Sequence, residues 1–234
     1  MPRSYTVLVP VYNEAPIIYA VLKRLVETVP PIGWSRKMVV VNDGSTDHSL
    51  QELDRFVADF PEVEMRVIHC DENRGKGAAF RQGLAVVQSE YVLIQDGDWE
   101  YHPADHASLL AAVGDDLNRV VYGSRFLRAE NVAAMSGRQR WGNRVLTRFA
   151  NWRSGLSLTD METCYKLMPV ALLRQLTLVE NDFRMEPEIT LKLAKLPQVT
   201  FVEVPISYAP RKALEGKKIN WKDGVRGLRA IARH

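Results

Sequence analysis

The first half of the chain alternates short apolar runs, rich in β-branched residues, with segments long enough to form a helix. The runs lie at residues 5–12, 37–43, 64–70, 91–96 and 119–122. This alternation is typical of an α/β fold with a mostly parallel sheet flanked by helices. Two of the helices have recognisable beginnings, at residues 45–47 for the segment that reaches Phe60 and at Pro103 for the segment that reaches Val113. In such sheets ligands bind beyond the carboxyl ends of the strands, so the residues that follow each run are the candidates for a site.

The second half is less regular but carries the same two kinds of pattern. It predicts a helix over 137–154, a short strand at 164–168, a helix over about 186–195 and a strand at 199–208. No linker rich in Gly, Pro or Ser divides the two halves. We therefore expect one domain over residues 1–212, made of a half at 1–122 and a half at 123–212, followed by a basic amphipathic segment at 213–234.

Composition narrows the class of protein. With 234 residues, 46% of them hydrophobic and 25% charged, the chain is typical of a soluble globular protein. Its two cysteines are too few for a disulfide framework and match no metal-ligand spacing. No apolar stretch reaches the roughly 18 residues of a membrane span, and the amino terminus leads into a strand pattern instead of a signal peptide. These features predict a cytoplasmic location.

The net charge of +3 hides an asymmetry between the two halves. Residues 1–122 contain 11 Lys and Arg against 18 Asp and Glu, whereas residues 123–234 contain 20 against 10. The basic half indicates an anionic partner. Composition leaves nucleic acid, a membrane surface and a phosphorylated substrate open.

Polar motifs follow four of the apolar runs. They are Pro10-Val11-Tyr12-Asn13-Glu14, Asn42-Asp43-Gly44-Ser45, Asn73-Arg74-Gly75-Lys76-Gly77 and Gln95-Asp96-Gly97-Asp98. Each one alone is also compatible with ordinary turn chemistry, but four at the same edge of a sheet indicate a binding site. A phosphate-binding loop of the Gly-x-x-x-x-Gly-Lys-[Ser/Thr] type is absent, and Phe80 stands where a dinucleotide fingerprint needs a small residue.

Asp96 and Asp98 are the most specific of these residues. A pair of carboxylates at the end of a buried strand is unfavourable unless a cation or a basic partner accompanies it. Mg²⁺ and similar ions prefer one or two carboxylates together with the oxygens of a substrate phosphate. The alternative is a solvated turn. The pair predicts a metal-dependent enzyme that acts on a nucleotide diphosphate.

The order and content of the four motifs resemble those of the family 2 inverting glycosyltransferases, which have the Rossmann-like GT-A fold. Further motifs at residues 123–126, 158–166, 186–190 and 203–208 resemble the branch typified by dolichol-phosphate mannose synthase. The resemblance covers almost the whole chain. It departs from the family at Gly97, where a small residue such as Ala is usual, and at Trp99, where Leu is common. These departures concern the shape of the donor pocket, not the metal ligands.

The resemblance implies roles for residues at the donor side. The nucleotide sugar would contact Pro10, Val11, Tyr12, Glu14, Asp43, Lys76, Asp96, Gly97, Asp98 and Arg211. In this scheme Asp43 lies near the base or ribose, and Asp96 and Asp98 reach the diphosphate through Mg²⁺ or Mn²⁺. Arg211 follows the last strand, and its guanidinium can bind two phosphate oxygens at once.

Two kinds of acceptor remain open. A lipid phosphate is already anionic and needs only positive residues, for which Arg125 and one or more of Arg138, Arg140 and Arg144 are the candidates. A sugar hydroxyl needs a general base, for which Asp160 is the candidate. Asp160 is equally compatible with a role as a helix or turn cap.

Two basic segments have an amphipathic pattern that suits a membrane surface. The first stripe contains Trp141, Val145, Phe149 and Trp152, and the second contains Trp221, Val225, Leu228 and Ala232, each flanked by arginines or lysines. Packing of either stripe on the core is the alternative.

The sequence therefore predicts a metal-dependent inverting glycosyltransferase at the cytoplasmic face of a membrane, to which it binds peripherally. It would move a sugar from a GDP- or UDP-linked donor to a polyprenyl phosphate such as dolichyl or undecaprenyl phosphate. The alternatives are transfer to a hydroxyl acceptor and a non-catalytic sugar-nucleotide-binding protein. A nucleic-acid partner has no role in this scheme. The sugar, the base and the oligomeric state are not specified.

Overall fold

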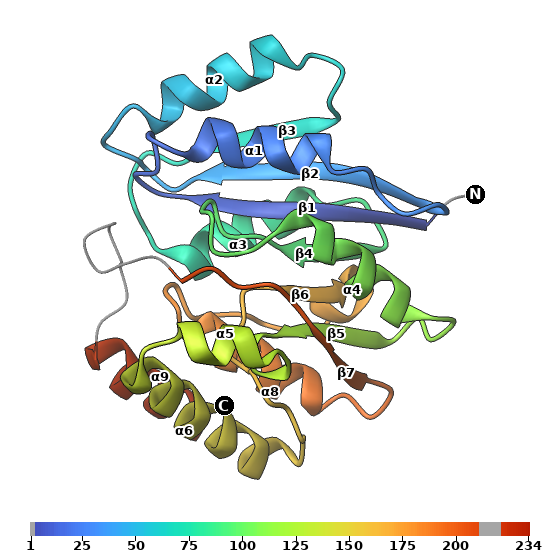
Figure 1. Ribbon diagram of the computed structural model, residues 1–234, viewed down its shortest axis with the longest axis vertical. Helices are drawn as coiled ribbons and strands as arrows, with labels where there is room; N and C mark the ends of the chain where they lie inside the picture. The colour runs from blue at the N-terminus through green and yellow to red at the C-terminus, as the bar shows by residue number, and fades with distance from the viewer. Residues whose placement is uncertain (1–2, 211–220) are drawn as a thin grey trace.

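The computed structural model describes residues 3–210 and 221–234, and these residues form one sheet with helices on both faces (Figure 1). Seven strands of the described chain lie in the order β3-β2-β1-β4-β6-β5-β7. Their bounds are Arg3–Val11 for β1, Trp34–Asn42 for β2, Met65–His69 for β3, Tyr91–Ile94 for β4, Arg119–Ser124 for β5, Lys166–Pro169 for β6 and Thr200–Pro205 for β7. The two halves predicted from the sequence thus share a single sheet.

The sheet is mostly parallel, as predicted, with one exception. Strands β1 to β4 pair in parallel, and so do β5 and β7. Strand β6 lies between β4 and β5 and is antiparallel to both. The amino end of β6 therefore lies at the same edge as the carboxyl ends of its neighbours. This arrangement carries the segment before β6 to the edge where the strand-end motifs are found.

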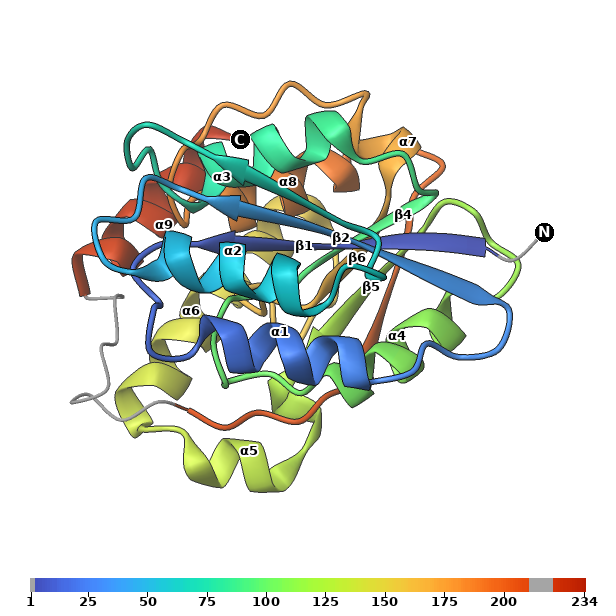
Figure 2. The same cartoon turned by 90° about the horizontal axis from the view of Figure 1, so that it is seen from above.

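Helices cover the two faces of the sheet unevenly. Helices α1 (Ile18–Glu27), α2 (Ser49–Asp59) and α4 (His106–Val113) lie on one face, and α3 (Lys76–Val86) and α8 (Met185–Ala194) on the other (Figure 2). The remaining helices are α5 (Ala129–Ala134), α6 (Gly137–Ser154), α7 (Val170–Leu173) and α9 (Trp221–Arg233), with 3-10 turns η1 (Pro103–Asp105) and η2 (Arg125–Leu127). Within the described ranges no helix has the length and apolarity to cross a membrane.

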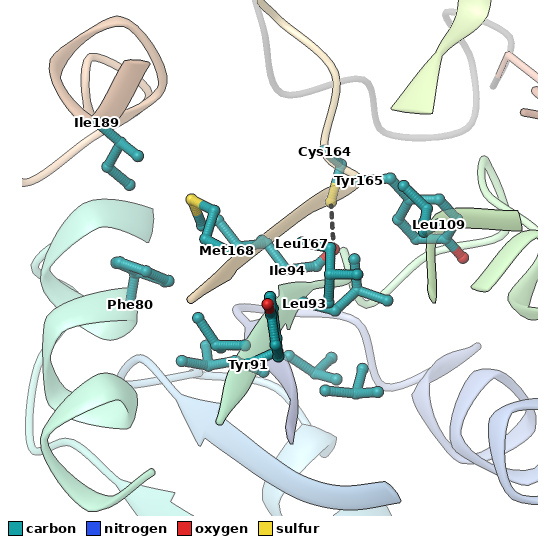
Figure 3. Close-up of a cluster of buried hydrophobic side chains, with 14 of the residues drawn as sticks. Phe80, Tyr91, Leu93, Ile94, Leu109, Cys164, Tyr165, Leu167, Met168 and Ile189 are labelled. Carbon is teal, nitrogen blue, oxygen red and sulfur yellow. Dashed lines mark hydrogen bonds between the residues drawn. The ribbon is translucent and has the colours of Figure 1, made fainter. Parts of the chain in front are cut away.

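The core is built around the central strands, which are buried on both faces. All four residues of β4 are buried, and so are all four of β6. Figure 3 shows Phe80 of α3 and Ile189 of α8 on one side of these two strands and Leu109 of α4 on the other. Burial on both faces explains why β4 is a continuous apolar run without alternation, while β6 carries one buried charge, Lys166.

The amphipathic stripes predicted for the two basic helices coincide only in part with the faces that pack, since Phe149 and Leu228 are partly buried against the core. The bounds of α6 are those predicted, but its buried residues are Leu146, Thr147 and Ala150. Trp141 and Trp152 are 71% and 75% exposed. The periodicity identified the helix but not its buried face, because that face is chosen by the elements packed around it.

Helix α9 packs against α6 and α8. Its buried residues are Gly227, Ala230 and Ile231, whereas Ala232, predicted to lie on the apolar stripe, is exposed. Leu228 of the predicted stripe is partly buried against the core. The side chains of Trp221 and Val225 lie outside the part that the structure describes.

Candidate active site

The strand-end motifs meet beside β1 and β4, at the point where the strand order reverses direction. The chain proceeds outward from β1 to β2 and β3, then returns to β4 on the other side of β1. In open α/β sheets this switch point is where ligands bind. Pro10, Tyr12 and Glu14 are partly exposed there, while Val11 is buried. Three of these four predicted nucleoside contacts thus present surface at the expected edge.

Hydrogen bonds join the loop after β1 to the loop after β2. The Asn13 side-chain oxygen accepts a hydrogen bond from the Thr46 backbone N–H at 2.8 Å. In return the Asn13 N–H donates to Ser45 Oγ at 3.0 Å, and the Glu14 N–H donates to Ser49 Oγ at 2.8 Å. Asn13 has a φ of 52°, a conformation that Asn adopts more readily than most residues. Sequence reasoning quoted Asn13 in its motif but gave it no role.

Asp43 holds the next loop. Its side chain is buried, and its two oxygens accept the backbone N–H groups of Arg74 at 3.0 Å and Gly75 at 2.7 Å. Gly75 has a φ of 100°, and a Cβ there would lie 2.5 Å from the Asn181 carbonyl oxygen. Asp43 was predicted to lie near the base or ribose; in the structure its carboxylate positions the loop that places Lys76 at the start of α3.

The carboxylate pair predicted as a metal site lies at the end of β4. Asp96 Oδ1 is 2.8 Å from Lys76 Nζ, and the Asp96 side chain is 28% exposed. Asp98 is buried, and its Oδ1 accepts the Glu100 N–H at 2.9 Å. Burial acts to raise the pKa of Asp96, but the neighbouring Lys76 ammonium outweighs it and holds that pKa below its usual value. Asp96 is therefore an anion with one side toward solvent.

The donor set of this pair fits a divalent cation shared with phosphate oxygens. Across residues 3–210 and 221–234, no group of three or more His, Cys, Asp and Glu side chains forms a metal cage. Asp96 and Asp98 supply carboxylate oxygens only, as Mg²⁺ and Mn²⁺ prefer. A cation held here would complete its coordination with the oxygens of a diphosphate.

The two departures from the family pattern lie beside the carboxylate pair. A Cβ at Gly97 would lie 3.3 Å from Ile18 Cδ1 and 3.5 Å from the Pro10 carbonyl oxygen, so an alanine would need only a small shift of a flexible side chain. Trp99 is exposed, with the Arg24 guanidinium 5.4 Å from its ring. Neither Gly97 nor Trp99 removes a carboxylate of the Asp96 and Asp98 pair.

The buried side chain of Gln95, the residue before Asp96, is held in place by two hydrogen bonds. Gln95 Oε1 accepts hydrogen bonds from the Tyr165 hydroxyl at 2.8 Å and from His106 Nε2 at 3.1 Å. These contacts join β4 to α4 and to the residue before β6. Burial lowers the pKa of His106 to about 3, so its ring is neutral at physiological pH.

This neutral histidine predicts a pH dependence of stability. Unfolding restores the pKa of His106 from about 3 to its ordinary 6.5, so the unfolded chain binds one more proton between these values. The free energy of unfolding should therefore rise with pH across this window, by at most about 1.4 kcal/mol per pH unit from this group. Above pH 6.5 His106 should cause no further rise. Urea unfolding at several pH values, compared with a His106→Gln variant, measures it. Equal slopes for the two proteins would refute the assignment.

Arg125 and Asp160 form a buried ion pair beyond the end of β5. Arg125 Nε and Nη2 each lie 2.7 Å from an Asp160 oxygen, and the Arg125 backbone N–H donates to the same carboxylate at 3.0 Å. The Arg125 guanidinium also lies 5.1 Å from the Tyr208 ring. Burial acts to lower the pKa of Arg125, but Asp160 outweighs it and raises that pKa well above its usual value.

This geometry disfavours Asp160 as a general base. The residue is fully buried, and both of its oxygens pair with Arg125. Its carboxylate also accepts the Arg125 N–H at the start of η2, whereas the residue whose side chain caps this turn is Ser124. Glu203 holds Asp160 in place by accepting its backbone N–H at 2.9 Å.

The three arginines predicted at the acceptor side lie on the first half of α6. Arg138 and Arg144 are exposed, and Arg140 is partly exposed. The Arg144 guanidinium lies 5.6 Å from the ring of Phe126, the residue after Arg125. The structure therefore brings Arg144 to the segment that carries Arg125.

The last predicted donor residue, Arg211, follows the end of the described segment 3–210. Arg211 lies outside the described residues; just before it, the Ala209 N–H donates to the Glu100 carbonyl at 2.9 Å, two residues past Asp98.

Glu162, which was not predicted as a site residue, is partly exposed between Asp160 and β6. Burial, reinforced by the Glu186 carboxylate, raises the pKa of Glu162 to about 7. No sequence signal distinguished it from other acidic residues.

Known proteins are similar to this chain in sequence and in fold. Glycosyltransferase AglJ of Haloferax volcanii is 29% identical over 211 residues, which cover 90% of this chain and 64% of that protein. The undecaprenyl-phosphate 4-deoxy-4-formamido-L-arabinose transferase of Pseudomonas fluorescens is 26% identical over 157 residues, covering 66% of this chain and 43% of that protein. The chain therefore spans less than two thirds of the length of these relatives.

A solved structure has the same architecture. The mannosyltransferase PcManGT of Pyrobaculum calidifontis, in complex with GDP-Man and Mn²⁺, superimposes with a TM-score of 0.65 at 20% identity, covering 91% of this chain and 59% of that one. The sequence profile described as Glycosyl transferase family 2 matches residues 6–177. The chain belongs to glycosyl transferase family 2 and has the GT-A fold predicted from its motifs.

Proposed function

We propose that this protein transfers a sugar from a GDP- or UDP-linked donor to a polyprenyl phosphate, with inversion at the sugar carbon and with Mg²⁺ or Mn²⁺. The observation that carries the proposal is the presence of two oppositely charged groups at one edge of the sheet. Asp96 and Asp98 lie at the end of β4, and Arg125 follows β5 at the same edge. A cation-bound diphosphate suits the first group, and the exposed Arg144 beside the Arg125 segment suits an anionic acceptor.

The donor side uses residues from three strand ends. Pro10, Tyr12 and Glu14 offer partly exposed surface for the nucleoside. Asp96 and Asp98 would hold the divalent cation, which neutralises charge on the departing diphosphate when it is bound. Lys76 and Arg211 add positive charge for the same diphosphate, and positive groups fixed beforehand stabilise developing negative charge without rearrangement.

The acceptor side needs positive charge and no general base. A phosphate monoester is an anion at neutral pH and is therefore already a nucleophile. Arg125 is fixed by Asp160, and the exposed Arg138 and Arg144 with the partly exposed Arg140 supply the guanidinium groups of a cradle. Bidentate contacts from such groups would set the direction of attack.

The similar proteins support this assignment by what their names describe. One relative is named for transfer to undecaprenyl phosphate, and the matching mannosyltransferase structure contains GDP-Man and Mn²⁺. Transfer to a hydroxyl acceptor is the second candidate. It is favoured by one observation: the partly exposed Glu162, whose raised pKa of about 7 suits a general base better than buried Asp160 does.

Contact with the cytoplasmic face of a membrane is part of the proposal. Trp141 and Trp152 are exposed on α6, and Arg144, Arg148 and Arg153 are exposed on the same helix. Exposed tryptophans beside arginines suit the interface between lipid headgroups and acyl chains. Such contact would place the acceptor cradle beside a lipid-borne phosphate.

The test combines donor screening with analysis of the product. Thermal shift with Mg²⁺ or Mn²⁺ and a panel of GDP- and UDP-sugars selects the donor, because a bound ligand raises the melting temperature. The radiolabelled donor is then incubated with undecaprenyl phosphate in vesicles. We expect label in the organic phase that mild acid releases, as a sugar phosphodiester requires. Acid-stable product would favour a hydroxyl acceptor, and donor binding without transfer to any acceptor would favour a non-catalytic protein.

A further inference from the structure

A chain of alternating charges extends inward from Asp96. Lys76 Nζ lies 2.8 Å from Asp96 Oδ1 and 2.9 Å from Glu186 Oε1. The other Glu186 oxygen lies 2.6 Å from Lys166 Nζ. Lys166 is fully buried, donates to the Thr163 carbonyl and lies 4.9 Å from the Tyr122 ring. Glu186 and Lys166 come from two motifs that the donor and acceptor roles above leave unused.

The four charges balance one another, and only one end of the chain faces the site. Buried charges are stable only when they are paired and hydrogen-bonded. Lys166 and Glu186 are almost inaccessible, Lys76 is slightly exposed, and Asp96 is the most exposed of the four. Lys76 thus places an ammonium on one of the two carboxylate oxygens that Asp96 could offer to a divalent cation.

Lys76 also has capacity for a third contact. An ammonium has three N–H donors. Among the residues that the structure describes, Lys76 Nζ has two carboxylate partners, Asp96 and Glu186, and it also lies 5.8 Å from the Phe183 ring. When a divalent cation binds Asp96, the anchor to Glu186 still keeps the ammonium beside the diphosphate.

We propose that Lys76 is a tethered cation, which neutralises Asp96 until a divalent cation arrives with the donor and then binds the diphosphate. Glu186, held by Lys166, is a positioning residue that keeps the ammonium at the site in both states. This inference rests on the proposed donor site. It assigns the buried ion chain a role in the exchange of one cation for another, beyond the stability of the fold.

The exchange predicts effects of opposite sign for one substitution. Lys76→Met removes the competing charge, so Mn²⁺ alone should bind about tenfold more tightly, as measured by electron paramagnetic resonance of free Mn²⁺. The same variant should bind GDP or UDP, whichever stabilises the wild type more, about tenfold more weakly at saturating Mn²⁺. Lys76→Arg should restore part of the nucleotide affinity. A matched control is Lys192→Met, which breaks the Lys192 to Glu188 pair on α8 and should change neither affinity.

A second variant tests the positioning residue. Glu186→Gln alone leaves the buried Lys166 without an anion and threatens folding, so it is combined with Lys166→Met. In the double variant Lys76 has Asp96 as its remaining carboxylate partner among the described residues, and Mn²⁺ alone should bind several-fold more weakly than in the wild type. A role in folding alone would lower the melting temperature and leave this affinity unchanged.

The outcomes separate the inference from the function on which it rests. If the wild type binds no Mn²⁺ in the presence of either nucleotide, the proposed donor site is wrong and this inference fails with it. If the wild type binds the Mn²⁺ nucleotide but Lys76→Met leaves the affinity for Mn²⁺ alone equal or weaker, the tethered-cation role is overturned and the proposed function stands.

Discussion

Asp96→Asn is expected to lower kcat for sugar transfer by about a thousandfold. The amide has nearly the same shape as the carboxylate but no charge, so it would neither hold a divalent cation nor balance Lys76, 2.8 Å away. The departing diphosphate would lose the cation that neutralises it. Steady-state assays with the donor selected by thermal shift measure the effect, together with the affinity for Mn²⁺ in the presence of nucleotide.

The control for this variant is Asp115→Asn, which makes the same change at an exposed position and should leave kcat unaltered. Circular dichroism and the melting temperature without metal establish that both variants fold. Turnover of the Asp96→Asn protein within about threefold of the wild type, corresponding to under 1 kcal/mol of the barrier, would show that the metal site has been assigned wrongly.

Asp160→Asn is expected to destabilise the protein by about 3–5 kcal/mol. The substitution removes the carboxylate that pairs with Arg125 through two contacts of 2.7 Å and leaves the guanidinium buried without its anion. Replacing both partners, as in Arg125→Leu with Asp160→Leu, should cost less than the single change because no unpaired charge remains. Denaturant unfolding of the three proteins gives the comparison.

The same variant separates two roles for Asp160. If Asp160 positions Arg125, the KM for a phosphate acceptor should rise and the pH profile of kcat should keep its shape. A loss of kcat with an altered pH profile and with unchanged stability would instead restore Asp160 as a general base. Glu27→Gln provides the stability control, since the exposed Lys23 to Glu27 pair spans 3.8 Å and should contribute less than about 1 kcal/mol.

Local patterns in the sequence were sufficient to assign many of the candidate site residues to one region. The runs that became β1, β2 and β4 end where their polar motifs begin, and parallel strands bring such ends to one edge. For that reason Tyr12, Lys76 and Asp96 could be assigned to one region without a structure. The bounds of α6 were equally accessible from its two ends, because Ser136 caps the first turn and Gly155 ends the helix in the left-handed conformation.

Ion pairs between residues distant in the chain could not be predicted from local patterns. Lys76 and Glu186 are 110 residues apart, and Arg125 and Asp160 are 35 apart. Glu186 reaches Lys76 because α8 of the second half packs beside the first half, and Asp160 reaches Arg125 because the segment before β6 returns to the end of β5. No local pattern encodes either neighbour. The sequence suggested Arg125 and Asp160 as separate groups with separate roles, whereas they form one buried unit.

The sequence by itself determined the succession of most strands and helices along the chain, without the short helices α5 and α7. It also determined the motifs that follow the strands and the acidic pair at the end of β4, since these depend on residues close together in the chain. Only the tertiary structure decided that β6 runs antiparallel between β4 and β5. That reversal carries residues 158–165 to the site edge, where Asp160 meets Arg125. Long-range strand order sets which charges become neighbours, and burial then makes their pairing obligatory.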